Sequence, residues 1–261
     1  MNQNITSGSL RSTVNTGAFD NLAELSLIAH AENVWFHVDG AFGSLIILDS
    51  ERRHLVNGIQ GADSLAFDCH KWLHCPTDVG CVLIRDKALL QSTFSMRQSY
   101  LPTAQQKSTM GDVFWDFGPE LSRSFRALKV WFTFKEHGAI KLGRKMADNC
   151  KQAQYLVSLL EKYGDIIHIV RPISLNIVNF RFEPDELNKS DTELLDCFNS
   201  ELLEDIKRSG IALLSSTYIY NRFYIRVAIL SHRVNNEDFD IFVETMLNLY
   251  RSRTQMFITG C

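Results

Sequence analysis

DSLAFDCHKWL, residues 63–73, sets a short apolar run directly before the pair His70 and Lys71. A second run, VWFHVDGAFG at residues 34–43, delivers Asp39, and 71 − 39 = 32 residues separate the aspartate from the lysine. Short apolar runs bounded by loops are typical of strands buried in an α/β sheet. Side chains at the carboxyl ends of such strands reach the crevice where α/β proteins bind ligands. The two runs therefore predict a ligand site that contains both Asp39 and Lys71.

An amine and a carboxylate in this arrangement suit pyridoxal 5'-phosphate (PLP). The Lys71 amine can hold the cofactor aldehyde as a Schiff base, and the Asp39 carboxylate can pair with the protonated pyridine nitrogen, which makes the ring a better electron sink. Because Lys71 follows an apolar strand, we expect its amine to be partly desolvated, which favours imine formation. Each residue alone has an ordinary explanation, since Asp-Gly after a strand is usually a turn. Their joint occurrence predicts carbanion chemistry on an amino acid.

Two further residues belong to the same hypothesis. Ala41 offers only a methyl group, so a flat heteroaromatic ring can stack closely on it. His37 lies on the same side of its strand as Asp39 and can donate a hydrogen bond that fixes the carboxylate. A histidine satisfied within the core is an equally good reading, and the sequence leaves both open.

The composition argues against several other classes of function. Of the 261 residues, 45% are hydrophobic and 22% are charged, as in an ordinary globular protein. A net charge of −3 without a basic stripe argues against a nucleic-acid partner. No apolar run approaches the length of a membrane span, and the polar start of the chain lacks the apolar core of a signal peptide. With six cysteines, these features predict a cytoplasmic protein with reduced thiols and no membrane partner.

A cluster of thiols and imidazoles around Lys71 invites comparison with a zinc site. Its members are Cys69, His70, His74, Cys75 and Cys81. The cluster has no C-x-x-C pair, and Pro76 would soon end any helix that brought the two histidines to one face. We therefore expect no metal at this place, and buried or loop thiols instead.

The first predicted domain spans residues 12–118. It begins with an amphipathic helix over residues 20–32 capped by Asp20, continues with three short strands, and has a helical segment over residues 49–56 between the first two. The polar segment 91–117 shows no sustained period. We interpret that segment as a lid over the site, with a mobile connector of no role as the alternative.

The second predicted domain spans residues 119–261. A long helical region broken at Gly138 is followed by short strands, one of them over residues 212–216, and by helices over about 191–209 and 236–251. This order predicts an α+β domain in which helices cover one face of a small antiparallel sheet.

Five stretches of the chain resemble one known family. They are TVNTGAFDNL (13–22), NVWFHVDGAFG (33–43), DSLAFDCHKWL (63–73), GCVLIRD (80–86) and LSRSFRALKVWF (121–132). Together they are similar to the group II PLP-dependent amino-acid decarboxylases, which include the aromatic-L-amino-acid, glutamate, histidine and tyrosine decarboxylases. The resemblance runs from about Thr13 to the C-terminus, and the S-x₆-K spacing that ends at Lys71 is its most specific part. It implies an α/β protein of PLP fold type I (aspartate-aminotransferase-like), with a partial large domain and a C-terminal α+β small domain.

The resemblance also implies roles for individual residues. Lys71 matches the Schiff-base lysine and Asp39 matches the partner of the pyridinium nitrogen. By the same match Ala41 packs on the ring, His70 lies near the cofactor, and Thr13 is a contact on the cofactor side.

The same resemblance implies a function for the predicted lid and an oligomeric state for the protein. Tyr100, in the sequence SYLP, matches the loop tyrosine that protonates the substrate carbon after carbon dioxide leaves. In the relatives that make aldehydes oxidatively, the residue matching this position is a phenylalanine. By this resemblance, a tyrosine favours plain decarboxylation. The family resemblance further implies a homodimer that acts on a small amino-acid substrate.

The match also departs from the family in places. Thr77 stands where an aromatic residue is usual, and Val79 where a small residue is usual. Family members carry a long N-terminal portion that does not match here, so we expect the C-terminal part of a decarboxylase, with an exposed sheet edge and apolar face.

The predicted function is decarboxylation of an L-amino acid to the corresponding amine. Transamination is one alternative, in which Arg226 would hold the substrate carboxylate, although a structural arginine explains that residue equally well. A non-catalytic truncated paralogue is the other alternative.

Overall fold

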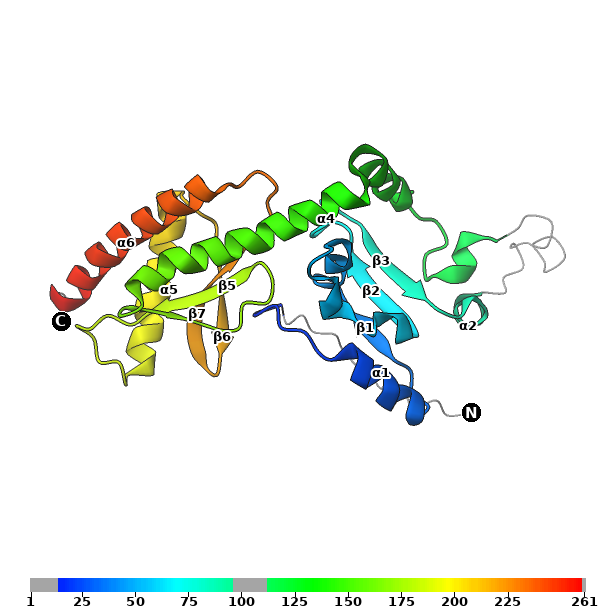
Figure 1. Cartoon of the computed structure of the whole chain (residues 1–261), viewed down its shortest axis with the longest axis horizontal. Coiled ribbons are helices and arrows are strands. Elements are labelled where there is room, and N and C mark those ends of the chain that lie inside the picture. Colours follow the sequence, from blue (N-terminus) through cyan, green and yellow to red (C-terminus); the bar gives the residue numbers. More distant parts are fainter. Residues whose placement is uncertain (1–13, 96–111, 260–261) are drawn as a thin grey trace. The chain divides into compact units, whose positions relative to one another are not determined.

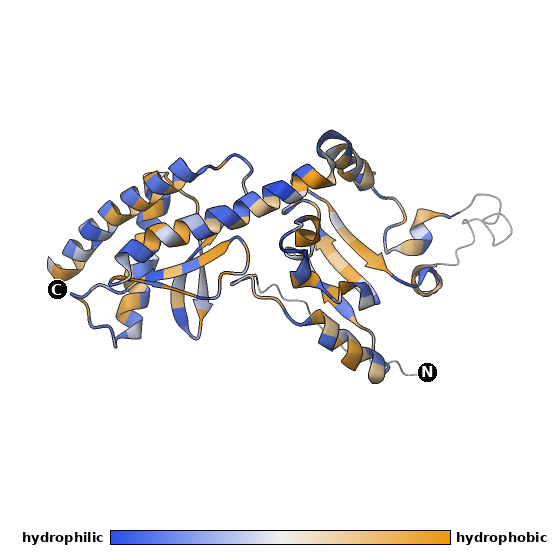
Figure 2. Ribbon diagram, viewed as in Figure 1, coloured by the Kyte–Doolittle hydropathy of each residue, from blue (hydrophilic) through white to orange (hydrophobic). Residues whose placement is uncertain are grey.

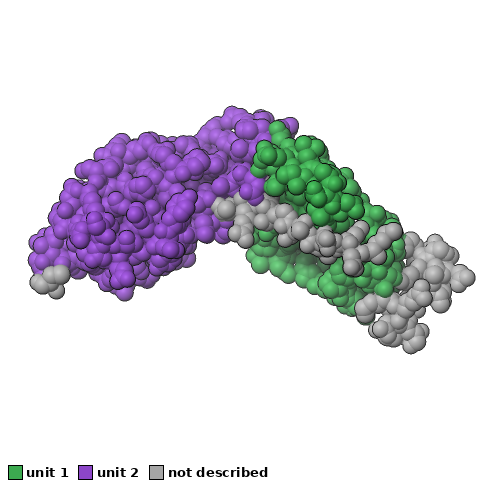
Figure 3. All heavy atoms as spheres, turned by 90° about the horizontal axis from the view of Figure 1, so that it is seen from below, with its two compact units in different colours: residues 1–10, 21–45, 56–138 green, residues 11–20, 46–55, 139–261 purple. Residues whose placement is uncertain are grey.

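The computed structural model of the chain describes residues 14–95 and 112–259. The chain forms two compact units, which Figure 3 colours separately. Unit 1 comprises residues 1–10, 21–45 and 56–138, and unit 2 comprises residues 11–20, 46–55 and 139–261. The predicted domain division between residues 118 and 119 stays a prediction.

Unit 1 is built on a sheet in the order β1-β2-β3 (Figure 1). The strands are β1 (His37–Asp39), β2 (Ser64–Asp68) and β3 (Gly80–Ile84), and the flanking helices are α1 (Leu22–Ala31) and α2 (Lys87–Phe94). Strands β1 and β2 run parallel, and β3 pairs with β2 in the antiparallel direction. The three strands predicted from the apolar runs are therefore confirmed, although β1 is shorter than its run.

Several local predictions for unit 1 need correction. Helix α1 is capped by Asn21, whose side-chain oxygen accepts from the Glu24 amide at 3.3 Å, and not by Asp20. The short 3-10 helices η1 (Ser44–Leu48) and η2 (Arg53–Val56) replace the helix predicted over residues 49–56.

Strand β3 departs from the expectation of strands buried on both faces. Val82 and Leu83 are 57% and 55% exposed. The reason is topological, because β3 lies at the edge of the described sheet and runs antiparallel to its one neighbour there. Because successive residues of a strand point to opposite faces, both faces of β3 are open to solvent at this point.

Unit 1 ends at Gly138, which lies inside the long helix α4 (Arg126–Leu160). Gly138 has φ 73° and ψ 154° inside this helix, which confirms the predicted break. A positive φ at this position favours glycine over any residue with a side chain.

Unit 2 contains a four-stranded antiparallel sheet in the order β4-β5-β7-β6 (Figure 1). Its strands are β4 (Ile167–Ile169), β5 (Ile177–Phe182), β6 (Ser215–Ile219) and β7 (Arg222–Ala228). Helices α5 (Thr192–Ser209) and α6 (Asn236–Thr259) contribute to the same core, together with the end of α4. The α+β arrangement agrees with the sequence prediction, although β6 lies three residues later than the strand predicted over 212–216.

Figure 2 shows apolar and polar residues, in orange and blue, mixed along the long helices α4, α5 and α6. Each helix therefore has one face suited to the core and one suited to water. Within the described residues, no helix has the length and apolar character needed to cross a bilayer.

A buried asparagine fastens α5 to the central sheet of unit 2. Asn199 is fully buried, and its side-chain oxygen accepts from the Phe182 amide at 2.7 Å. Its amide nitrogen donates to the Phe182 carbonyl at 2.9 Å and to the Leu195 carbonyl at 2.8 Å. The side chain therefore satisfies both backbone groups of the last β5 residue, which would otherwise be buried without partners.

We predict that Asn199→Ala lowers the free energy of unfolding of unit 2 by about 2–4 kcal/mol, because it leaves buried backbone groups unpaired. Hydrogen exchange of the β5 amides measures this loss in unit 2 alone. Asn188→Ala is the matched control, since Asn188 is exposed and caps a turn, and we expect it to change stability by less than about 1 kcal/mol. Equal protection of the β5 amides in the two variants would contradict the role of Asn199.

Candidate functional site

The segments that follow β1 and β2 leave the sheet at the same edge. Strand β1 ends at Asp39, which is paired in register with Ala66, and β2 ends at Asp68. The Gly40 amide donates to the Ala66 carbonyl at 2.8 Å, and the Asp68 amide donates to the Ala41 carbonyl at 3.2 Å. These bonds continue the parallel pairing past the strands, so the residues after each strand start side by side.

Ring stacking joins the same two segments further out. Phe42 follows β1 and Trp72 follows β2, and their rings lie parallel with centroids 5.1 Å apart and an interplanar angle of 7°. Trp72 is fully buried. The contact anchors the turn that carries Lys71 against the loop that carries Ala41. Sequence reasoning missed this pair, although an aromatic residue within four positions of the end of each strand was a usable signal.

Lys71 lies in the turn directly after β2. Its backbone amide donates to the Asp68 carbonyl at 3.3 Å, and its Nζ lies 2.7 Å from Asp68 Oδ2. The lysine side chain is 38% exposed, so the amine is partly desolvated and carries an ion pair. Asp68 did not figure among the residues expected from the sequence.

Asp39 is exposed at the end of β1 and is oriented by the turn that follows. Its Oδ1 accepts from the Ala41 amide at 3.1 Å. This bond fixes the direction of the carboxylate and leaves Oδ2 for another partner. Ala41 itself is half-buried.

His37 is held by a hydrogen bond to the neighbouring strand. Its Nδ1 lies 2.6 Å from Ser64 Oγ, which also accepts from Trp35 Nε1 at 2.8 Å. Because the indole can only donate, the hydroxyl hydrogen of Ser64 is available to His37 Nδ1, which favours the ring tautomer with hydrogen on Nε2. A bond from His37 to Asp39 stays a prediction.

His70 supports the hairpin between β2 and β3. Its Nδ1 accepts from the Val79 amide at 3.0 Å, which leaves Nε2 as the ring atom for a ligand. The structure thus carries Asp39, Ala41, His70 and Lys71 on two adjoining turns. The two other expected site residues, Thr13 and Tyr100, lie outside the described residues.

Arg226 takes a structural position in unit 2. From β7 its Nε donates to the Val14 carbonyl at 2.9 Å and its Nη1 donates to Ser215 Oγ at 3.2 Å. Asn179 on the adjacent strand donates to the Asn15 carbonyl at 2.7 Å. Burial lowers the pKa of the Arg226 guanidinium. Of the two readings left open for this residue, these contacts favour the structural one.

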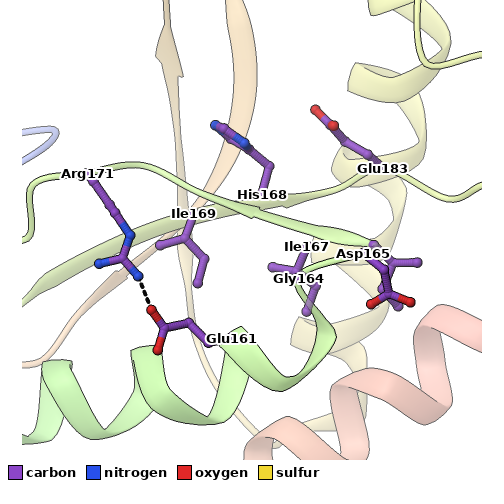
Figure 4. A pocket seen from close by; sticks show the side chains of 9 residues that line it. Glu161, Gly164, Asp165, Ile167, His168, Ile169, Arg171 and Glu183 are labelled. Carbon is purple, nitrogen blue, oxygen red and sulfur yellow. Dashed lines mark hydrogen bonds and ion pairs between the residues drawn. The ribbon is translucent and has the colours of Figure 1, made fainter.

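A separate concavity of about 250 Å³ lies in unit 2 (Figure 4). Arg171 and Glu161 in its lining form an ion pair, His168 lies on β4, and Glu183 directly follows β5. None of the residues expected from the sequence to form the site lines this pocket. It therefore contributes nothing to the candidate site.

The thiol that precedes His70 is shielded. Cys69 is 2% exposed, and burial raises its pKa to about 12, with smaller contributions from Cys81, Cys75 and Asp68. Across residues 14–95 and 112–259, no three side chains among His, Cys, Asp and Glu are grouped to hold a metal ion.

We predict that Cys69 resists alkylation in the folded protein, because the reactive thiolate is scarce below its pKa of about 12 and the sulfur is buried. Iodoacetamide followed by peptide mass mapping should label Cys69 roughly a hundredfold more slowly than the exposed Cys197. Since only the thiolate reacts, the rate at Cys69 should rise about tenfold for each unit of pH. Comparable labelling of both thiols in folded protein would refute the shielding; in denaturant they should react alike.

Comparisons with known proteins point in one direction. The family model of the pyridoxal-dependent decarboxylase conserved domain matches residues 6–183. The chain is 38% identical over 227 residues to an aromatic-L-amino-acid decarboxylase of Bacillus atrophaeus, covering 87% of this chain and 46% of that protein. It is 30% identical to a histidine decarboxylase of Mus musculus, covering 87% of this chain and 32% of that protein. It is also 30% identical to a phenylacetaldehyde synthase of a Rosa hybrid cultivar, covering 83% and 42%.

Solved structures give the same answer for the fold. The structure of Oryza sativa TDC with PLP and tryptamine matches with a TM-score of 0.86 at 24% identity, covering 94% of this chain and 50% of that one. Mouse CSAD in apo form matches with a TM-score of 0.82 at 25% identity, covering 94% and 51%. These matches confirm the predicted PLP fold type I. The chain spans about half the length of the relatives it matches.

Proposed function

The chain belongs to the pyridoxal-dependent decarboxylase family, and from this premise we propose that it serves the decarboxylation of an L-amino acid to the corresponding amine. The observation that carries the proposal is the pairing of β1 with β2, which starts the segments of Asp39 and Lys71 side by side. The decarboxylases among its relatives support the reaction type.

The residues of these two turns fit the cofactor of the family. PLP, when bound, supplies an aldehyde for covalent attachment and an electron-withdrawing ring. Lys71 offers the single amine of the site for the aldehyde, and Asp39 offers a carboxylate oxygen not used by the Ala41 amide for the ring nitrogen. The methyl group of Ala41 leaves room for a flat ring. This donor set matches both ends of pyridoxal.

The chain's own residues then hold protons and orient groups. An ionised Asp39 stabilises a proton on its ring-nitrogen partner, and the Ala41 amide keeps that carboxylate turned in one direction. The Nε2–H of His37, favoured by the bond at Nδ1, is placed on the same side of β1 as Asp39 and can support the carboxylate. His70 would present Nε2 to the cofactor.

Two proposed contributions rest on the family resemblance. Thr13 would contact the cofactor, and the phenol of Tyr100 would deliver the proton to the substrate carbon after carbon dioxide leaves. A phenol can do this only where the segment around it excludes water, which is the role we propose for residues 91–117 as a lid.

We also propose a cytoplasmic homodimer with domains at residues 12–118 and 119–261. Unit 1 exposes several large apolar side chains, which suit an interface. They include Phe114, Phe125, Leu128, Trp131 and Phe132. The five free thiols of the described residues suit a reducing compartment.

Formation of an aldehyde is the second candidate, because a phenylacetaldehyde synthase is among the relatives. Transamination is less well supported, since the Arg226 side chain already donates to Val14 and Ser215. A chain without catalytic activity is the remaining alternative.

We predict that Lys71→Ala abolishes covalent attachment of PLP, because no other amine is offered at this turn. The protein is incubated with PLP and reduced with borohydride, and the modified lysine is located by mass mapping. Asp39→Ala should retain attachment but lose turnover by on the order of a hundredfold, since the charge that stabilises the protonated ring is gone. Labelling of the wild type at a different lysine would overturn the assignment of Lys71, and undiminished turnover in Asp39→Ala would overturn that of Asp39.

We predict that Tyr100→Phe diverts the product from amine toward aldehyde, because it removes the proposed proton donor. Amine and aldehyde are quantified together by chromatography after reaction with an aromatic L-amino acid. An amine yield equal to that of the wild type would contradict the assignment.

A further inference from the structure

The ion pair of Lys71 differs from the other lysine ion pairs of the described residues. Its carboxylate, Asp68, is 25% exposed, whereas the carboxylates of the other lysine pairs in that part of the chain are 49–71% exposed. Water and salt screen a partly buried pair less than an exposed one. Among these lysine pairs, the one at Lys71 therefore has the carboxylate least screened by solvent.

The backbone fixes the Asp68 carboxylate in its place. Asp68 is the last residue of β2, where its amide is bonded to the Ala41 carbonyl and its backbone is paired with Gly80 of β3. A Cβ at position 80 would lie 3.3 Å from Asp68 Oδ1, so the absent side chain of Gly80 leaves the carboxylate room. The lysine three residues later is held by a group that is itself anchored on both sides.

We infer that Asp68 is the docking group of the Lys71 amine, and that it competes with an aldehyde for Nζ. Docked at 2.7 Å as an ammonium, the nitrogen has no lone pair with which to attack. Attachment requires that Nζ leave Asp68 and give a proton to solvent. The nitrogen then bonds to the aldehyde carbon, and the carbonyl oxygen departs as water.

The inference deepens the proposed function, on which its meaning for PLP rests. In a reaction that detaches the lysine from the cofactor, Asp68 would receive the freed amine and keep it near. Asp68 is thus a positioning residue that acts through Lys71.

The test measures the reactivity of Lys71 toward formaldehyde, with cyanoborohydride to reduce the adduct. Methylation at each lysine is quantified by mass mapping at neutral pH, and Lys189 in the same sample is the internal reference. We expect Asp68→Asn to raise Lys71 methylation roughly threefold to tenfold, as removal of a partly buried charge partner predicts. Asp68→Glu, which keeps the charge, should stay closer to the wild type.

The matched control is the exposed pair of Lys87 and Asp112, with Nζ 2.5 Å from Oδ2 and a carboxylate that is 59% exposed. In Asp112→Asn, measured against Lys71 as reference, methylation of Lys87 should change less than about twofold, because exposed pairs contribute little. If Asp68→Asn does not fold, Asp68→Ser removes the same charge and carries the same test.

Unchanged methylation of Lys71 in a folded Asp68→Asn variant would overturn the inference. A rise equal to that of Lys87 in Asp112→Asn would overturn it as well. These outcomes are separate from the proposed function, because formaldehyde reports on the amine without PLP. A protein that shows the expected methylation but no attachment of PLP would contradict the proposed function and leave the docking of Lys71 supported.

Discussion

The parallel pairing of β1 with β2 is the constraint on which the candidate site depends. It sets Asp39 opposite Ala66, and the bonds from Gly40 to Ala66 and from Asp68 to Ala41 extend it past the strands. A shift of one residue in this register would turn the side chain of Asp39 to the other face of the sheet. Asp39 and Lys71 are 32 residues apart in the sequence. The register of β1 against β2, and not this separation, places the two turns that carry them at the same edge of the sheet.

The parts of the fold that sequence predicted well are those written in local patterns. Apolar runs bounded by loops marked β2 and β3, and the helical periods marked α5 and α6. The break at Gly138 was visible because glycine tolerates a positive φ that other residues avoid. Lys71 and Asp39 stood out because each follows an apolar run.

The remaining features depend on contacts that no local pattern encodes. The apolar sequence of β3 suggested burial, yet Val82 and Leu83 are exposed because of the strand's place in the sheet. Asp68 looked like an ordinary strand end, and only the turn that follows brings Lys71 Nζ to its carboxylate. Asn199 gave no signal at all, because its partner Phe182 lies on a separate strand.

The stacked pair of Phe42 and Trp72 has a spectroscopic consequence. Trp72 is adjacent to Lys71, fully buried, and in parallel contact with the ring that follows Ala41. The fluorescence of a buried indole is sensitive to the polarity and packing around it. The chain thus carries an intrinsic optical reporter one residue from the Lys71 amine, and once the other three tryptophans are replaced, the emission of Trp72 can follow rearrangement of both turns without any added dye.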